Sequence, residues 1–281
     1  MVMMRFPALL SRIALLACAL LAAATPARAD VKALLLATDY AEAADSRLQL
    51  DNPVADGRMI AAALRRTTVD EIELVEEPDA ARWGTAFEDF AASLSGDDIA
   101  FVYFAGHGFQ IDGANYLLAA DGHSLIGLDA MLRRLTGEAR GVVFVVDACR
   151  NNPLIEADRS TELEIVAVEG AQRALDTVTL DDIVFSNRGL AQVGSLRGLS
   201  AVVFFSTEPG NVAEDGATAG KGSPFAIEFA REIRRRQSLD ETFRKTAVAV
   251  NERTSGRQSP WRQGDLPFDV FIGGMRALPI P

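Results

Sequence analysis

Short apolar runs recur along the chain, separated by segments in which apolar and polar residues alternate with a helical period. Four runs stand out, at residues 34–37, 99–105, 142–146 and 201–205. They are rich in Val, Ile, Leu and Phe and have no polar face, which is typical of strands buried on both sides in a mainly parallel sheet. We expect these four runs to form the centre of one sheet.

Amphipathic segments lie between and after the apolar runs. Pro53 suits the first position of a helix whose apolar residues follow through to Leu64. The same periodicity predicts helices around residues 87–94, 128–135 and 225–233, and Ser238 with Glu241 has the spacing of a capping box that opens one more. Strands that alternate with helices in this order predict a doubly wound α/β fold, with helices on both faces of a mainly parallel central sheet.

Two other segments interrupt this alternation. Asp112 and Gly113 stand between the β-prone runs 109–111 and 116–118, which predicts a hairpin. Residues 154–197 are polar and charged without a long apolar period, and we interpret them as a long connection.

The first 29 residues have the parts of a secretory signal peptide. Arg5 and Arg12 precede an apolar run at 13–24, and the small-x-small sequence Ala27-Arg28-Ala29 follows. The apolar run is too short to span a bilayer comfortably. We expect cleavage after Ala29, export across the inner membrane and a periplasmic protein that comprises residues 30–281.

The charge of the chain narrows the choice of partners. The formal net charge is −11, and removal of residues 1–29 takes away three arginines and no acid, which leaves −14. Because such a surface repels phosphate backbones and anionic lipid, we expect neither nucleic acid nor, after signal cleavage, a membrane as partner. Basic ligands are mildly favoured.

Cysteine use limits the chemistry further. The chain has two cysteines, and Cys18 lies in the predicted signal peptide, so Cys149 is the only one expected in the mature protein. An intramolecular disulfide and a cysteine-based zinc site are therefore excluded. A lone thiol in an oxidising compartment is a liability unless it is buried or used.

Two of the predicted strands end in residues that can carry chemistry. Residues 99–105 lead directly into Gly106-His107-Gly108, and residues 142–146 lead into Asp147-Ala148-Cys149. In open α/β sheets, ligands bind beyond the carboxyl ends of the strands. If the two strands are neighbours, about 5 Å apart, the imidazole and the thiol face each other, and a neighbouring imidazole activates a thiol. The flanking glycines would let a substrate backbone approach closely.

The motifs around these two residues resemble those of a known family. Tyr-Phe-Ala-Gly-His-Gly at 103–108 and Val-Val-Asp-Ala-Cys-Arg-Asn-Asn-Pro at 145–153 are similar to the two catalytic motifs of bacterial caspase-like peptidases, relatives of metacaspases and caspases in the C14 group. Further pieces agree in order and spacing, at 51–56, 188–191, 207–210, 223–225 and 260–261. The resemblance covers nearly the whole chain after residue 29 and implies a caspase-like three-layer α/β/α sandwich.

The resemblance also implies a mechanism and a specificity. Cys149 would attack the scissile carbonyl, His107 would protonate the leaving amine, and the N–H groups of Gly108 and Cys149 would form the oxyanion hole. Asp147 occupies the position of an acid that lines the S1 pocket in metacaspase-like members, and Asp215 resembles a second acid there. Protein or peptide substrates with Arg or Lys at P1 follow from this resemblance, and an acidic pocket fits a guanidinium chemically.

The family also implies how the domain is divided and activated. A large-subunit-like part would cover residues 30–153, a linker 154–197 and a small-subunit-like part 198–281. Many members cleave themselves in this linker, and Arg159, Arg173, Arg188 and Arg197 are candidate sites. No cofactor is implied. Calcium activates some relatives and stays open here, although the sequence shows no dedicated calcium cluster.

Other interpretations stay open at this point. Cys149 could be an inert buried residue, Asp147 could cap a turn, and Asp215 lies in a sequence typical of a plain turn. The main alternative function is a catalytically silent caspase-like module for protein interaction. A serine hydrolase that uses Ser124 is less favoured, since its surrounding sequence lacks the second glycine of a nucleophile elbow.

Overall fold

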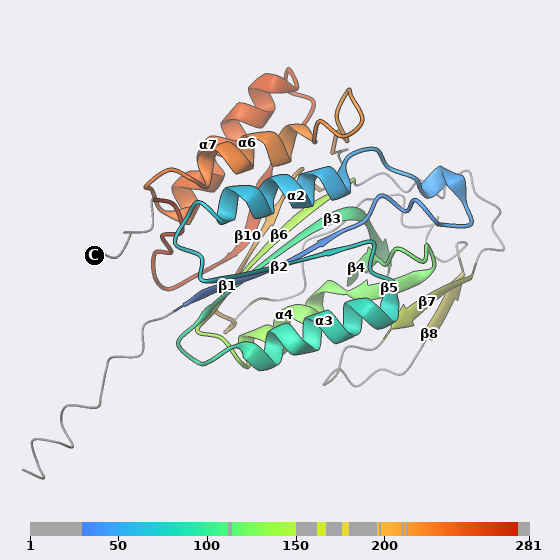
Figure 1. Cartoon of the computed structure of the whole chain (residues 1–281), viewed down its shortest axis with the longest axis horizontal. Coiled ribbons are helices and arrows are strands. Elements are labelled where there is room, and N and C mark those ends of the chain that lie inside the picture. Colours follow the sequence, from blue (N-terminus) through green and yellow to red (C-terminus); the bar gives the residue numbers. More distant parts are fainter. Residues whose placement is uncertain are drawn as a thin grey trace, which may run out of the picture.

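The computed structural model describes residues 30–111, 114–149, 162–166, 176–179, 196, 198–209, 211 and 213–274. Its centre is a twisted sheet whose strands run side by side through the molecule (Figure 1). In spatial order the strands of this main sheet are β2 (Glu71–Glu76), β1 (Val31–Ala37), β3 (Ile99–Ile111), β6 (Gly141–Cys149), β9 (Ala201–Phe205) and β10 (Trp261–Asp265). All neighbours are parallel except β9 and β10, which are antiparallel. The prediction of a mainly parallel sheet is confirmed.

Helices cover both faces of the main sheet. On one face lie α2 (Pro53–Leu64), α6 (Pro224–Glu232) and α7 (Leu239–Arg253), and on the other lie α3 (Ala80–Ser93) and α4 (Leu128–Thr136) (Figure 1). Successive strand residues point to opposite faces, so each strand contributes to two cores. The architecture is the three-layer α/β/α sandwich that the sequence predicted.

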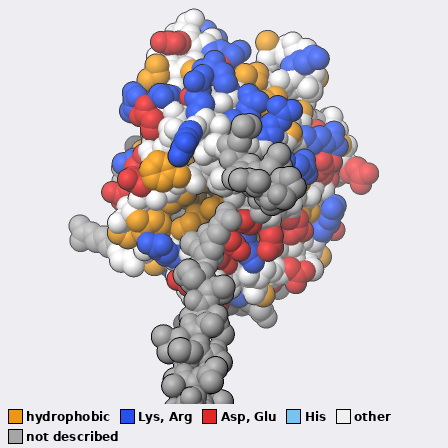
Figure 2. All heavy atoms as spheres, turned by 60° about the vertical axis from the view of Figure 1, so that its left-hand side comes forward, with side chains coloured by type: hydrophobic (Ala, Val, Ile, Leu, Met, Phe, Trp, Pro, Cys, Tyr) orange, Lys and Arg blue, Asp and Glu red, His pale blue; other side chains and the backbone are white. Residues whose placement is uncertain are grey.

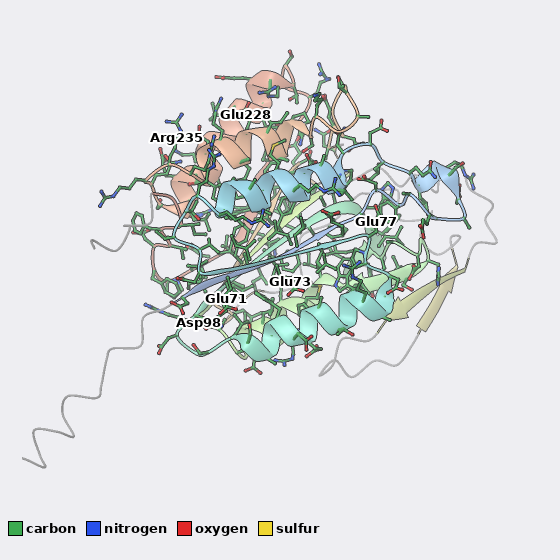
Figure 3. All side chains as sticks on the ribbon, viewed as in Figure 1. Glu71, Glu73, Glu77, Asp98, Glu228 and Arg235 are labelled. Carbon is green, nitrogen blue, oxygen red and sulfur yellow. The ribbon has the colours of Figure 1, made fainter. Side chains whose placement is uncertain are left out.

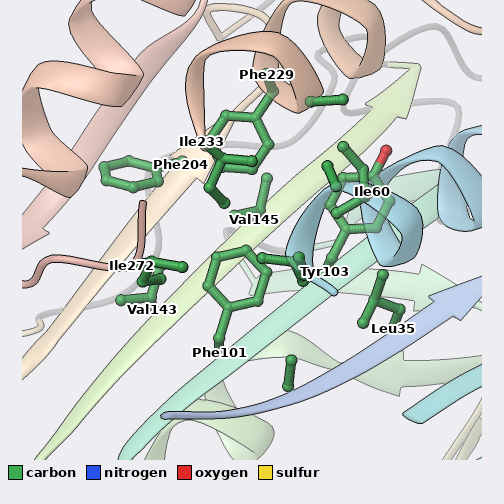
Figure 4. Packing of buried hydrophobic residues seen from close by; sticks show 14 of the residues in the cluster. Leu35, Ile60, Phe101, Tyr103, Val143, Val145, Phe204, Phe229, Ile233 and Ile272 are labelled. Atoms are coloured by element: carbon green, nitrogen blue, oxygen red, sulfur yellow. The ribbon is translucent and has the colours of Figure 1, made fainter. Parts of the chain in front are cut away.

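The packing explains why these strands are uninterrupted apolar runs. Phe101, Val143 and Phe204 pack against Phe229 and Ile60 in the core beneath α2 and α6 (Figure 4). Their sequence neighbours belong to the second core, under α3 and α4; these include Val102, Phe144 and Val203. All of these side chains have lost their contact with water almost completely. Burial on both faces provides the main stabilisation of the sheet.

A smaller sheet branches from the end of β3. Beyond residue 107, β3 pairs with β4 (Ala114–Leu118), which pairs with β5 (Ser124–Gly127). The predicted hairpin is confirmed by the antiparallel register of β3 and β4, although its turn residues 112 and 113 lie outside the described residues. Two strands from the long connection, β7 (Glu162–Val166) and β8 (Asp176–Thr179), continue this sheet from β5.

The ends of two helices are fixed by serine side chains. Ser238 accepts a hydrogen bond from the N–H of Glu241 at 3.2 Å and caps α7 as predicted. Ser223 accepts one from the N–H of Ala226 at 3.0 Å and caps α6. Each cap satisfies an amide that the first helical turn leaves without a partner.

Charge is distributed unevenly over the surface. Lys and Arg side chains gather on the upper part of the molecule, where α6 and α7 lie, and Asp and Glu side chains lie below and beside them (Figure 2). Acidic residues also mark the two edges of the sheet, with Asp98 near its amino edge and Glu77 near its carboxyl edge (Figure 3). Among the helices that the structure describes, none is both long and apolar enough to cross a membrane.

Candidate functional site

The two predicted catalytic residues lie on neighbouring central strands. In the parallel register of β3 and β6, His107 is the partner of Cys149, and Ala105 is the partner of Asp147. Register partners on adjacent strands are about 4.8 Å apart. The structure therefore brings His107 and Cys149 together at the carboxyl edge of the sheet. Only the backbone of Cys149 is described, and its thiol lies outside the described part of the chain.

His107 is buried and held by a main-chain carbonyl. The residue is 2% exposed, and its Nε2 lies 2.8 Å from the carbonyl oxygen of Leu48, the last residue of the short 3-10 helix η1 (Ser46–Leu48). Because a carbonyl can only accept a hydrogen bond, Nε2 carries the proton and Nδ1 keeps its lone pair. Among the described residues, no group binds this Nδ1. Burial lowers the pKa of His107 to about 4, against a smaller opposing effect of the Leu48 carbonyl. The imidazole is thus a neutral base at neutral pH, with its free nitrogen at Nδ1.

Tyr40, to which the sequence assigned no role, fixes the backbone of the histidine. Its ring stacks on that of His107 with 4.7 Å between centroids, and its hydroxyl accepts a hydrogen bond from the His107 N–H at 2.7 Å. The same hydroxyl donates to the carbonyl of Leu118 in β4 at 3.1 Å. The Tyr40 hydroxyl therefore links the backbone of His107 in β3 to the backbone of Leu118 in β4.

The two glycines beside His107 have different surroundings. At Gly106, a Cβ would lie 2.7 Å from the Tyr40 hydroxyl and 2.8 Å from the ring of Phe104. Tyr40 thus makes a close approach that requires a glycine at this position. Gly108 is the register partner of Leu117, at the point where β3 passes from the main sheet to the smaller one.

Asp147 lies at the base of an acidic cluster. Its Oδ2 accepts hydrogen bonds from the hydroxyls of Tyr103 and Ser223, each at 3.0 Å. Burial raises the pKa of this carboxyl above its usual range, although the hydroxyl donors oppose the shift. Burial and then the neighbouring Asp147 also raise the pKa of Tyr103, so the phenol keeps the proton that it donates.

Asp56 is a second buried acid of this cluster, to which the sequence assigned no role. It lies on α2, is 2% exposed, and its Oδ1 accepts a hydrogen bond from the Ser223 N–H at 2.8 Å. Burial and then the charge of Asp147 raise the pKa of Asp56 far above the usual range for a carboxyl. Its signal in the sequence is an acid on the apolar stripe of a helix, since it is three positions after Pro53 and four before Ile60.

Asp215 completes the cluster from a third part of the chain. Its Oδ2 accepts a hydrogen bond from the Asp51 N–H at 2.8 Å. Burial raises its pKa to about 6, and repulsion from Asp147 and then Asp51 acts in the same direction. The structure thus brings the two acids predicted for one pocket, Asp147 and Asp215, into the same electrostatic environment together with Asp56.

This cluster favours a cationic ligand. Three carboxyl groups with raised pKa values repel one another and have lost much of their hydration. A guanidinium or ammonium group placed among them would relieve both penalties and form charge-assisted hydrogen bonds. Over the ranges that the structure describes, no three His, Cys, Asp or Glu side chains are arranged to hold a metal ion.

The other residues considered from the sequence lie away from this site or outside the described residues. His123 is exposed on a loop, where its N–H donates to Asp121. Ser124 begins strand β5, so it does not stand on the strand-to-helix turn of a nucleophile elbow. The four arginines proposed for self-processing, Arg159, Arg173, Arg188 and Arg197, lie outside the described residues, as does the predicted signal peptide.

Comparison with known proteins agrees with this arrangement. Residues 30–271 match the family model of peptidase group C14, described as "Caspase domain". No curated protein sequence matches the chain. A crystal structure of a protein from Geobacter sulfurreducens is similar with a TM-score of 0.59 and 15% identity, over 88% of this chain and 97% of that one. The crystal structure of caspase-1 from Spodoptera frugiperda is similar with a TM-score of 0.58 and 13% identity, over 89% of this chain and 92% of that one.

Proposed function

Since the chain belongs to the caspase-domain family of peptidases, we propose that it is an exported cysteine endopeptidase that hydrolyses peptide bonds after Arg or Lys. The observation that carries this proposal is the register pairing of His107 with Cys149 at the carboxyl ends of two adjacent central strands. A nucleophile and its base need this proximity. The family membership supports the peptidase class, and the acidic cluster supports the choice of a basic side chain at P1.

The tautomer of His107 supports a defined path for the protons. The thiol of Cys149 would pass its proton to Nδ1 as the sulfur attacks the scissile carbonyl carbon. The resulting imidazolium, held at Nε2 by the Leu48 carbonyl, would give this proton to the leaving amine when the peptide C–N bond breaks. Water would then attack the thioester and give a proton to Nδ1, and that proton would return to the sulfur as the carboxyl product leaves.

The negative charge that develops on the carbonyl oxygen requires donors. We assign the oxyanion hole to the main-chain N–H groups of Gly108 and Cys149, which follow from the family resemblance. Preorganised donors of this kind contribute about 3–4 kcal/mol to catalysis in other acyl-transfer enzymes. The scheme uses no metal or organic cofactor, and assays with and without calcium test whether calcium activates the protein.

The S1 pocket would be formed by Asp147, Asp215 and the additional acid Asp56. The three residues come from β6, from the loop before α6 and from α2, so the pocket joins distant parts of the chain. A P1 guanidinium would bind the ionised carboxylates and lower their pKa values. Binding of a basic P1 residue should therefore release protons near neutral pH.

Location and processing belong to the same proposal. The arrangement of Arg5, Arg12, the apolar run 13–24 and Ala27-Arg28-Ala29 supports export and a periplasmic protein that begins at Asp30. Self-cleavage in the linker 154–197 would fit a specificity for Arg. Prolonged incubation of active protein that leaves only the full-length mature band would contradict self-processing.

The decisive experiment compares the protein from Asp30 onward with its Cys149→Ala variant. Both are incubated under reducing conditions, with and without calcium, with fluorogenic peptides that carry Arg, Lys or Asp at P1. We expect cleavage after Arg and Lys by the wild type and none by the variant. If the folded wild type cleaves nothing and a thiol-directed covalent inhibitor leaves Cys149 unlabelled, the protein is instead a silent caspase-like interaction module.

A further inference from the structure

Asn52 occupies a helix-capping position but does not cap the helix. It precedes Pro53 at the start of α2, is fully buried, and its side chain makes no hydrogen bond to the first turn. A carboxylate oxygen of Asp39 accepts instead from the Val54 N–H at 2.8 Å. Asparagine is common at this position because it caps well. Here the cap is supplied by another part of the chain, and the amide of Asn52 is available for a different contact.

That contact is made with the loop that carries Asp215. The Oδ1 of Asn52 accepts hydrogen bonds from the N–H groups of Lys221 and Gly222, at 3.0 and 2.8 Å. Its Nδ2 donates to the carbonyl oxygen of Asp215. These partners are 163 to 170 positions away in the sequence. One buried side chain thus holds both ends of the loop from Asp215 to Gly222.

The loop has few other contacts between Asp215 and Gly222: the Gly220 N–H donates to the Asp51 carbonyl at 3.2 Å, and the Lys221 N–H is shared with the Thr218 carbonyl at 3.2 Å. Residues 213–222 form neither helix nor strand, and residues 218–221 are exposed. Gly216 and Gly222 have φ angles of +97° and +93°, which residues with a side chain rarely adopt. At Gly216, a Cβ would lie 2.6 Å from the carbonyl oxygen of Gly222 and 3.3 Å from Nδ2 of Asn52. The loop therefore closes tightly around the Asn52 amide.

We propose that Asn52 is the positioning residue of the S1 pocket, which holds the loop so that Asp215 faces Asp147 and Asp56. The proposal rests on the proposed function, because it names the residue that organises the pocket for a basic P1 side chain. Asn52 does not touch the substrate. It acts through Asp215, whose carboxylate is also bound by the adjacent Asp51 N–H. Loss of Asn52 should weaken binding of Arg and Lys substrates while His107 and Cys149, on β3 and β6, stay in place.

The test measures kinetics and amide hydrogen exchange on the protein from Asp30 onward. For Asn52→Ala we expect KM for an Arg peptide to rise by about 10-fold with kcat within about twofold, the pattern of lost binding rather than lost chemistry. The amides of Lys221 and Gly222 should exchange at least about 10-fold faster. In Asn52→Asp the oxygen that accepts from Lys221 and Gly222 remains and the donor to Asp215 is lost, so these amides should stay protected while KM still rises.

Because a buried position can fail to fold when it is changed, a second pair of variants disturbs the same contact from the loop. Gly216→Ala should raise KM as Asn52→Ala does, since its Cβ would meet the Gly222 carbonyl. Gly220→Ala is the matched control: it also has a positive φ, of +69°, but its Cβ would meet nothing within 4 Å, so its KM should change much less.

The outcomes separate this proposal from the proposed function. If the wild type does not cleave basic peptides, the proposed function fails, and hydrogen exchange still tests whether Asn52 holds the loop. If the wild type cleaves them and Asn52→Ala changes neither KM nor the exchange of Lys221 and Gly222, the positioning role is wrong. An equal loss of kcat and of labelling of Cys149 by a small thiol reagent would also overturn it, because it would show a general disturbance of the fold.

Discussion

The Nε2 atom of His107 and the carbonyl oxygen of Leu48 lie 2.8 Å apart, and this contact determines which ring nitrogen can act as a base. Leu48 belongs to η1, a single 3-10 turn in which the Arg47 N–H donates to the Asp45 side chain at its start. A loop remote from both catalytic strands in sequence therefore fixes the protonation of the imidazole. Because this histidine is buried and neutral, the free energy of unfolding should depend on pH.

The free energy of unfolding should decrease as the pH falls, because His107 is buried in its neutral form. Its pKa is about 4 in the folded protein and about 6.5 in an unfolded chain. Between these values the unfolded state binds the proton more readily, so the stabilisation present above pH 6.5 is lost as pH falls towards 4. The effect amounts to about 3 kcal/mol. Urea unfolding of the wild type and of His107→Gln at pH 7 and pH 4 measures it. The wild type should lose more free energy of unfolding than the variant; equal losses in both would contradict the assignment.

Removal of the Tyr40 hydroxyl should impair catalysis without altering the catalytic residues. In Tyr40→Phe, the His107 N–H and the Leu118 carbonyl lose their partner inside the protein. A buried polar group left unpaired costs about 1–3 kcal/mol. We expect kcat to fall by about 10-fold and the unfolding midpoint in urea to decrease, with KM for an Arg peptide nearly unchanged. An unchanged kcat would show that Tyr40 has no part in holding the imidazole.

The sequence predicted the elements that are buried on both sides. The central strands β1, β3, β6 and β9 are continuous apolar runs because neither face meets water. Strand β2 was not predicted, since it is an edge strand in which three of six residues are glutamates and only Val75 is buried. Charged edge strands of this kind resist association with other sheets, and their hydrophobic signal is correspondingly weak.

The site residues that lie at the ends of strands could be predicted from the sequence. His107, Cys149 and Asp147 directly follow apolar runs, so their shared edge followed from the topology of an open sheet. Asp56 and Asn52 were missed because their partners, Ser223, Gly222 and Asp215, come more than 160 positions later. Helical periodicity reports which residues face the core, but it does not report which loop they meet there.

The affinity of the protein for basic substrates should fall at acidic pH because Asp215 becomes protonated. Its pKa is raised to about 6, so its carboxyl becomes protonated as pH falls below this value and can no longer pair with a guanidinium. We expect KM for an Arg peptide to rise between pH 7 and pH 5. In Asp215→Asn, KM should be high at both pH values and this dependence should be much weaker. A profile of KM against pH that is the same in wild type and variant would place the titrating group elsewhere.

Gly106 should tolerate no side chain, because Tyr40 packs closely against it. In Gly106→Ala, the new Cβ would lie 2.7 Å from the Tyr40 hydroxyl and 3.0 Å from Thr38 Cγ2, at a φ of +155°. Displacement of Tyr40 would break its hydrogen bond to the His107 N–H, so we expect kcat to fall at least as far as in Tyr40→Phe.

Gly84→Ala is the matched control for this substitution. Gly84 lies within α3, and a Cβ there would meet nothing within 4 Å. Alanine is the better helix former by about 1 kcal/mol, so this variant should be more stable and fully active. If Gly106→Ala kept wild-type kcat, Tyr40 would have to accommodate the methyl group without releasing the histidine. Joint loss of activity in Gly106→Ala and Tyr40→Phe, with no further loss in the double variant, would show that both act through the same contact.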